Sequence, residues 1–393
     1  MSGTRRIAAS RIEGFGTSIF TEMSRLAVEH QAINLGQGFP DFEGPDFVKD
    51  AAAAAIHADL NQYAPSQGTP RLRTAIANDW SRRYGREIDA ERDVTVTTGA
   101  TEAIFAAILA LLDPGDEIIF FEPFYDAYTA DVQMAGGVSR VVRLHPPDWH
   151  YDPDELRAAF SPRTKLFLLN TPHNPTGKVF SRPELDEIAA ICVEHDVTVL
   201  SDEVYDRIVF DDHEHVPIAT LPGMWERTLT INSTGKTFSM TGWKIGYTIG
   251  PAELNAVTRA VHQFAVFATA TPFQDAMASA LETAGERGYY QRLIDEYSTR
   301  RDRLRSALAD VGLPPLDCQG SYFLLSDVTS LGFTNDVEFC RHLVIESGVA
   351  AIPPSAFYLD PSTAPPLARF CFAKRLETID AAAERMAGLR RLV

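Results

Sequence analysis

Residues 228–236 read TLTINSTGK, a short apolar run followed at once by small polar residues and a lysine. The apolar part predicts a strand over Thr228 to Ile231, and similar short runs alternate upstream with longer amphipathic ones. This alternation is typical of βαβ units, so we predict an α/β fold with a mostly parallel sheet. The other strands predicted for this sheet are Val94 to Thr97, Glu117 to Phe121, Val138 to Leu144, Lys165 to Asn170 and Val197 to Leu200.

The pattern changes after Pro251 to long helical stretches and a short α/β tail, which indicates a second, smaller domain. We predict three parts: an N-terminal segment over residues 1–45 that packs on the small domain, a large domain over 46–284 and a small domain over 285–393. The predicted helices are Thr101 to Leu112, Asp154 to Phe160, Arg182 to Glu194, Glu253 to Phe264, Pro272 to Ala284, Gly288 to Val311 and Val337 to Ser347. The strands predicted in the tail are Ser321 to Leu325, Val349 to Ile352 and Arg369 to Phe372.

The amino-acid composition excludes several classes of protein. The 393 residues include 36 Lys and Arg against 53 Asp and Glu, a formal net charge of −17, which argues against nucleic acid as a partner. The four cysteines lie far apart with no CxxC pair, so neither a disulfide framework nor a zinc knuckle is indicated. No apolar run has the length of a signal peptide core or a membrane span. We therefore expect a cytoplasmic protein without a membrane partner.

Polar residues follow the predicted parallel strands at the edge where open α/β sheets bind their ligands. Residues 98–101 (TGAT) lead directly into a helix, whose free N–H groups could hold a phosphate. Asn174 follows a second strand in a proline-rich loop, Asp202 and Tyr205 follow a third, and Lys236 follows a fourth. Taken singly, these are also typical of a glycine turn, a helix N-cap, a core aromatic and a surface lysine. Their combination at one edge favours a binding site.

Together these groups match the requirements of pyridoxal phosphate. A lysine among small hydroxyl residues could be a desolvated nucleophile, so Lys236 would bind the aldehyde carbon of the cofactor. Asp202 would pair with the pyridine nitrogen and make the ring an electron sink, while Asn174 and Tyr205 would hydrogen-bond the ring oxygen. The residues expected at the phosphate are Gly99, Ala100, Thr101, Ser233 and Lys244.

A set of short motifs carries a family resemblance over nearly the whole chain. They are residues 34–40 (NLGQGFP), 61–63 (NQY), 122–126 (EPFYD), 173–177 (HNPTG), 202–205 (DEVY) and 233–236 (STGK). In order and spacing they resemble the class I/II aminotransferases, which are fold-type I pyridoxal phosphate enzymes. The resemblance implies transfer of an α-amino group from an L-amino acid to a 2-oxo acid, with Lys236 both carrying the cofactor and moving the Cα proton.

The resemblance also assigns roles to further residues. It implies that Tyr125 stacks on the cofactor ring and that Tyr63 reaches the phosphate in the neighbouring subunit, so a homodimer with composite active sites is expected. It further implies that Arg369 binds the substrate α-carboxylate as a bidentate fork and that the backbone of Gly38 contacts the substrate.

The residues expected around the side-chain pocket indicate which amino acids serve as amino donors. The chain is similar to the kynurenine/glutamine transaminase K and methionine aminotransferase branch, and to N-succinyldiaminopimelate aminotransferases. Phe20 stands where the kynurenine type carries tryptophan, and Ala268 where it carries histidine. A pocket bordered by Phe20, Tyr125 and Phe267 should accept apolar, aromatic or sulfur-containing side chains.

Several alternatives remain open. N-succinyldiaminopimelate could be the donor, or the same cofactor could support β-elimination from cysteine S-conjugates. An aminotransferase-like domain of a transcription regulator is disfavoured, because only about 30 residues precede the first motif and the charge is acidic. The run Asp211-Asp212-His213-Glu214-His215 contains potential metal ligands, but its spacing in an expected loop favours a solvated connection, so no metal is predicted.

Overall fold

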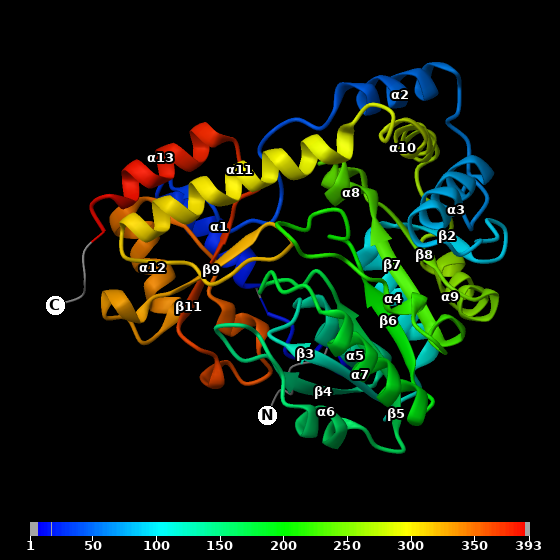
Figure 1. Ribbon diagram of the computed structural model, residues 1–393, viewed down its shortest axis with the longest axis horizontal. Coiled ribbons are helices and arrows are strands. Elements are labelled where there is room, and N and C mark those ends of the chain that lie inside the picture. The colour runs from blue at the N-terminus through cyan, green and yellow to red at the C-terminus, as the bar shows by residue number, and fades with distance from the viewer. Residues whose placement is uncertain (1–6, 17, 390–393) are drawn as a thin grey trace.

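The computed structural model describes residues 7–16 and 18–389, and a seven-stranded sheet in the order β2-β8-β7-β6-β5-β3-β4 organises its larger part (Figure 1). Every neighbouring pair in this sheet is parallel except the two pairs that involve β8. The predicted α/β architecture with a mostly parallel sheet is therefore confirmed. The strands are β2 (Val94–Thr98), β3 (Glu117–Glu122), β4 (Val138–Arg143), β5 (Thr164–Asn170), β6 (Thr198–Asp202), β7 (Thr228–Ser233) and β8 (Ile245–Ile249).

Helices cover both faces of this sheet, as burial of a parallel sheet requires. Apolar side chains of α7 pack on one face of β3, β5 and β6, and those of α4 and α5 pack on the other. The helices of the larger part are α2 (Asp46–His57), α3 (Pro70–Tyr84), α4 (Gly99–Leu111), α5 (Ala127–Ala135), α6 (Pro153–Ala159), α7 (Arg182–Glu194), α8 (Thr234–Thr237), α9 (Ala252–Ala265) and α10 (Thr271–Thr283).

β8 is the strand of this sheet that the sequence pattern did not predict. It runs antiparallel between β2 and β7, and so places the residues after Lys236 beside the start of α4. The approach is close: a Cβ on Gly246 would lie 2.4 Å from the carbonyl carbon of Gly99. Glycine at position 246 therefore permits the two segments to meet.

The remaining elements form a second, smaller group at the other side of the molecule (Figure 1). β9 and β11 are antiparallel, and β1 pairs in parallel with β10. Helix α1 contacts α12 and β10, so the segment before residue 46 lies against C-terminal elements. The elements are α1 (Ile19–Glu29), β1 (Ile33–Asn34), α11 (Tyr289–Asp310), β9 (Phe323–Asp327), α12 (Asp336–Ser347), β10 (Val349–Ala350), β11 (Leu367–Cys371) and α13 (Leu376–Met386).

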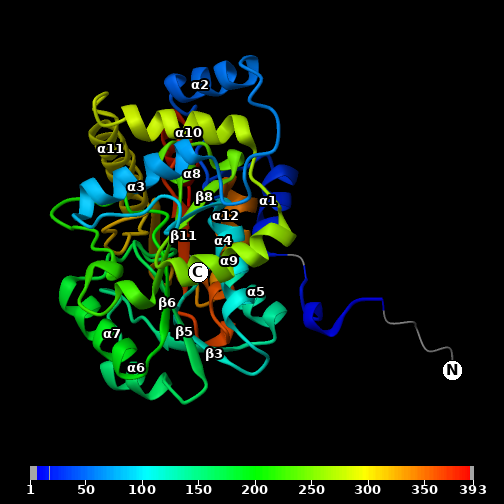
Figure 2. The ribbon, with the colours of Figure 1, turned by 90° about the vertical axis from the view of Figure 1, so that its right-hand side faces the viewer.

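Two features of the chain's ends bear on the predicted division into parts. Figure 2 shows residues 7–16 running outward from the rest of the chain, and within this segment the carbonyls of Arg11 and Glu13 accept hydrogen bonds from Gln133 of α5. Residues 1–6, 17 and 390–393 lie outside the described residues. The division at 45/46 and 284/285 stays a prediction.

Candidate active site

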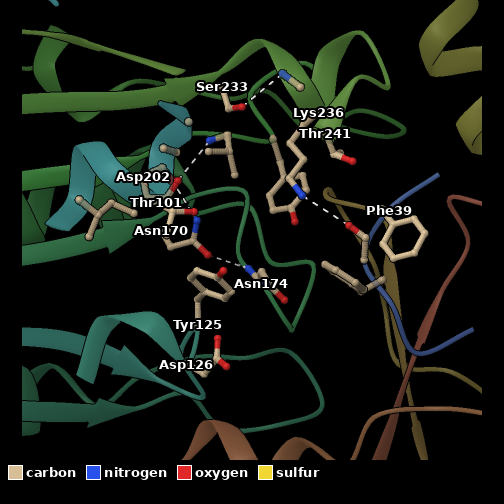
Figure 3. Close-up of a pocket in the computed structure, with 18 of the residues that line it drawn as sticks. Phe39, Thr101, Tyr125, Asp126, Asn170, Asn174, Asp202, Ser233, Lys236 and Thr241 are labelled. Atoms are coloured by element: carbon tan, nitrogen blue, oxygen red, sulfur yellow. Dashed lines mark hydrogen bonds between the residues drawn. The ribbon is translucent and has the colours of Figure 1, made fainter. Parts of the chain in front are cut away.

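A cavity of about 370 Å³ opens at the carboxyl ends of β5, β6 and β7, beside the start of α4 (Figure 3). Because these strand ends meet at one edge of the sheet, side chains distant in sequence converge there. The predicted site residues that line the cavity are Phe20, Gly38, Gly99, Ala100, Thr101, Tyr125, Asn174, Asp202, Tyr205, Ser233, Lys236, Lys244 and Arg369.

Lys236 lies on α8, directly after β7, and its amine points into the cavity (Figure 3). Its Nζ donates to the hydroxyl of Tyr322 at 2.8 Å and to the carbonyl of Gly38 at 3.4 Å. Desolvation by the surrounding protein lowers the pKa of Lys236 to about 8. An amine with that pKa is suited both to nucleophilic attack and to proton transfer near neutral pH.

Asp202 is the last residue of β6, two positions beyond Leu200, where the sequence pattern predicted the strand to end. The hydroxyl of Tyr128 donates to its Oδ2 at 2.5 Å, and the backbone N–H of Val204 donates to Oδ1 at 3.4 Å. Burial raises the pKa of Asp202 to about 6, while these donors and the Lys236 amine lower it. The carboxyl group is therefore buried but still ionised at neutral pH.

The first turn of α4 and Lys244 form a cradle for an anion. Helix α4 begins at Gly99, so its unpaired N–H groups and positive dipole end face the cavity. Lys244 stands opposite, with its Nζ 3.3 Å from Thr101 Oγ1. A Cβ on Gly99, whose φ is +76°, would lie 3.0 Å from Lys244 Cε, so glycine leaves room for the ammonium group.

Arg369, on β11, is buried at the opposite wall of the cavity. Its Nη1 donates to Asn174 Oδ1 at 3.0 Å and its Nη2 to the Gly36 carbonyl at 3.1 Å, while its buried Nε has no partner in the described chain. The guanidinium lies over the Phe323 ring at 4.1 Å and near the rings of Phe20 and Phe357. A planar cation among aromatic rings can bind a carboxylate strongly, because little water competes for it.

Tyr63 and Phe267 are the predicted site residues that the structure does not bring into this cavity. Phe267 follows α9 with a φ of +73°, and its ring contacts that of Tyr63 edge to face, with the ring centroids 5.2 Å apart. Tyr63 is 85% exposed and Phe267 is 47% exposed. Within one chain, Phe267 therefore does not border the pocket as the sequence analysis expected.

Other residues of the site were missed by the sequence analysis. Asn170 holds the Asn174 loop by accepting from its backbone N–H at 2.8 Å, and Tyr128 donates to Asp202. Asn170 ends a predicted strand and so carried a signal, whereas Tyr128 lies on α5, which was not predicted. Tyr322 and Lys374, discussed below, come from segments without a recognisable polar pattern.

Two residues of the run 211–215, which contains potential metal ligands, have other partners. Asp211 pairs with Arg301, and His215 lies 2.9 Å from Glu203. Across the described ranges, no group of three or more His, Cys, Asp or Glu side chains is arranged to hold a metal ion. Nor does any helix within residues 7–16 and 18–389 have the length and apolar character to cross a bilayer.

The donor set fits pyridoxal phosphate. The cavity offers one partner for each of three groups of this cofactor. The amine of lowered pKa suits the aldehyde, the buried ionised carboxyl group suits the pyridine nitrogen, and the glycine-lined helix start that faces a lysine suits the phosphate. Tyr125 also lines this cavity and offers its ring for stacking (Figure 3).

Comparison with known proteins agrees with this chemistry. The chain belongs to the family described as "Aminotransferase class I and II", whose sequence model matches residues 30–386. It is a fold-type I enzyme that depends on pyridoxal phosphate and transfers an amino group from an amino acid to a 2-oxo acid.

Particular relatives span almost the full length. The chain is 45% identical to a methionine aminotransferase from Escherichia coli, over 98% of this chain and 99% of that protein. It is 41% identical to a kynurenine–oxoglutarate transaminase from Dictyostelium discoideum, over 98% and 96%. The solved structure of an N-succinyldiaminopimelate aminotransferase from Mycobacterium tuberculosis superposes with a TM-score of 0.93 at 46% identity, covering 97% of this chain and 99% of that one.

Proposed function

We propose that the amino donors of this aminotransferase are L-amino acids with apolar, aromatic or sulfur-containing side chains. The observation that carries the proposal is the position of Arg369, which faces the same cavity as Lys236 and lies among the rings of Phe20, Phe323 and Phe357. Arg369 is the one arginine in the described lining. Once Arg369 binds the α-carboxylate, the described lining offers no second guanidinium for a side-chain carboxylate, so the rings favour an apolar side chain.

The described residues have distinct roles in this proposal. The bound cofactor supplies an electron sink for the negative charge that develops when the substrate Cα loses its proton. Lys236 takes that proton with its amine and returns it after the charge has moved, since its pKa of about 8 suits both directions. Asp202 keeps the pyridine nitrogen protonated, Asn174 and Tyr205 hold the ring oxygen, and Arg369 orients the substrate.

We also propose a homodimer in which each subunit completes the other's site. Tyr63 and Phe267 support it because they lie together, exposed and outside this chain's own cavity. Exposed aromatic pairs of this kind are typical of interfaces.

We further propose a cytoplasmic location, which four free and buried cysteines support.

A panel of donors and acceptors tests the donor class. Purified, cofactor-loaded enzyme is assayed with methionine, phenylalanine, kynurenine, glutamine and N-succinyldiaminopimelate against several 2-oxo acids, with the Lys236→Ala variant as the blank. We expect the highest kcat/KM with methionine or an aromatic donor. Highest activity with N-succinyldiaminopimelate would overturn the proposed donor class, and pyruvate release from a cysteine S-conjugate without an added oxo acid would identify β-elimination.

The shared site is tested by mixing variants. Neither Lys236→Ala nor Tyr63→Ala subunits should be active alone, but a refolded mixture should recover activity, because one of the two sites in a mixed dimer has both residues. Sedimentation should give a dimer for each sample. Monomeric, fully active wild-type enzyme would contradict the proposal.

A further inference from the structure

The backbone of residues 36–39 is held by side chains from the C-terminal part of the chain. Arg369 donates to the Gly36 carbonyl, and Tyr322 donates to the Gly38 carbonyl at 2.5 Å. Lys374 donates to the carbonyls on either side of Gly38, at 3.3 Å to Gln37 and 2.8 Å to Phe39. Four consecutive carbonyls are therefore bound by donors that follow them by about 300 residues.

Tyr322 connects this segment to Lys236. Its hydroxyl proton is directed to the Gly38 carbonyl, so an oxygen lone pair is left to accept from Lys236 Nζ at 2.8 Å. Burial raises the pKa of Tyr322 well above its ordinary value, so the hydroxyl keeps the proton that this arrangement needs. The tyrosine is an oriented acceptor for the amine.

Lys374 sets the position of the Gly38 carbonyl. Its side chain is only 3% exposed, and across residues 7–16 and 18–389 it forms no ion pair with a carboxylate. Its ammonium group instead binds the carbonyls of Gln37 and Phe39, the residues before and after Gly38. The side chains of Tyr322 and Lys374 leave the same end of the β9–β11 pair, where Phe372 N–H donates to the Tyr322 carbonyl at 3.0 Å. The two donors therefore share one rigid platform.

We propose that Tyr322 is a positioning residue that holds the free amine of Lys236 in the cavity, and that Lys374 positions Tyr322 through the Gly38 backbone. The proposal deepens the role of Lys236 and rests on that residue being the amine that binds the cofactor. Tyr322 keeps the amine at one place whenever it is not covalently attached, so the amine does not have to be reoriented before it takes a proton.

The expected effect of removing the hydroxyl has a definite sign. The other titratable or charged groups that face Lys236 are Asp202, Tyr205, Lys244, Arg369 and Cys371. All of them stay in a Tyr322→Phe variant. An ammonium donates a stronger hydrogen bond than a neutral amine, so loss of the Tyr322 acceptor destabilises the charged form and lowers the pKa of Lys236 by about one pH unit.

Trace acetylation measures this pKa without any turnover. Full-length protein freed of cofactor is treated with acetic anhydride from pH 6 to 10, and acetylation of Lys236 is quantified by peptide mass spectrometry. The midpoint should lie about one pH unit lower in Tyr322→Phe than in wild type, and acetylation at pH 6.5 should be about tenfold faster. Tyr297→Phe is the matched control, because its ring stacks on Tyr322 at 6.2 Å without a hydrogen bond to Lys236 in the described chain.

A double-mutant cycle tests Lys374. Because Lys374→Met also removes a positive charge, the informative quantity is the shift that Tyr322→Phe causes in the Lys374→Met background. We expect this shift to fall to less than half of its value in wild type and to return in the Lys374→Arg background, which keeps donors for both carbonyls. An undiminished shift in Lys374→Met would remove Lys374 from the proposal.

Two outcomes separate this inference from the proposed role of Lys236. Reloading each protein with pyridoxal phosphate should protect Lys236 from acetylation, which also shows that the variants fold. Failure of wild type to show protection would contradict the role of Lys236 itself. Protection in every variant, together with a Tyr322→Phe midpoint equal to that of wild type and Tyr297→Phe, would overturn the inference alone.

Discussion

Tyr128→Phe should change the pH at which the cofactor binds. The variant removes one hydroxyl, which donates to Asp202 Oδ2 at 2.5 Å in a fully buried site. Burial raises the pKa of Tyr128 well above its ordinary value, so the hydroxyl remains a donor at every practical pH. Its loss leaves the Asp202 carboxylate with the weaker Val204 N–H as its remaining donor in the described chain.

The size of the effect follows from the pKa of Asp202, which is about 6 in the intact protein. A hydrogen bond to a charged group is worth about 1.5–3 kcal/mol, so its removal raises that pKa by about 1–2 units. In the proposed role of Asp202, its ionised form would bind the protonated pyridine nitrogen, so we expect the affinity for the cofactor to fall as pH decreases through the pKa of Asp202. With a variant pKa of about 7, the ionised fraction at pH 6 falls from about one half to roughly one tenth, an affinity loss of about fivefold.

The assay is titration of cofactor-free protein with pyridoxamine phosphate from pH 5.5 to 8.5, followed by tryptophan fluorescence. This form lacks the aldehyde, so covalent attachment to Lys236 does not contribute to the measured affinity. Tyr151→Phe, which removes a buried hydroxyl bound to Glu187 away from the cavity, is the matched control and should behave as wild type. A Tyr128→Phe profile that coincides with both would refute the reasoning.

Three further predictions concern binding and stability. Arg369→Lys should lower kcat/KM about 100-fold, or about 2.7 kcal/mol, because an ammonium cannot replace the fork that binds Asn174 and Gly36 and that we propose to bind the substrate carboxylate; a loss within threefold would contradict this. Gly38→Ala places a Cβ 2.8 Å from the Phe323 ring, so we expect the free energy of unfolding to fall by about 1–3 kcal/mol, and unchanged denaturant midpoints would count against the close approach. Glu117 is buried against Arg140 and Arg163, which hold its pKa at about 2; Glu117→Gln should destabilise the fold by about 3 kcal/mol at pH 7, as measured by urea unfolding. A carboxyl group with a lowered pKa stabilises the folded state fully above its pKa in the unfolded chain, and this contribution is lost as pH falls to its pKa in the folded protein. The difference in stability between wild type and Glu117→Gln should therefore shrink as pH falls from about 4.5 toward 2, and a pH-independent difference would exclude the mechanism.

The sequence predicts the part of the site that strand ends create. Thr101, Asn174 and Lys236 each follow a strand and Asp202 ends one, and because parallel strands end at a common edge, these residues meet as a consequence of topology. The predicted strands fall within one to a few residues of those observed because buried parallel strands are nearly continuous apolar runs. β8 was missed because it runs antiparallel and follows β7 after two very short helices, α8 and a 3-10 helix at Thr241–Trp243, which breaks the alternation of strands with long amphipathic helices.

The rest of the site depends on contacts that no local pattern encodes. Tyr322 reaches Gly38 across 284 residues, and Lys374 reaches Phe39 across 335. Phe267 is not among the residues that line the cavity, and its left-handed backbone conformation is not predictable from its neighbours in sequence. Such long-range packing is set by how the two groups of elements meet, and only the folded chain reveals it.

The attachment point of the cofactor is the most direct measurement. Cofactor-loaded enzyme is reduced with borohydride, digested and analysed by mass spectrometry, in parallel with the Lys236→Ala variant. We expect wild type to carry the reduced cofactor on Lys236 alone, with loss of its visible absorbance band, and the variant to carry none. Attachment at any other lysine, or an equal yield in the variant, would contradict it.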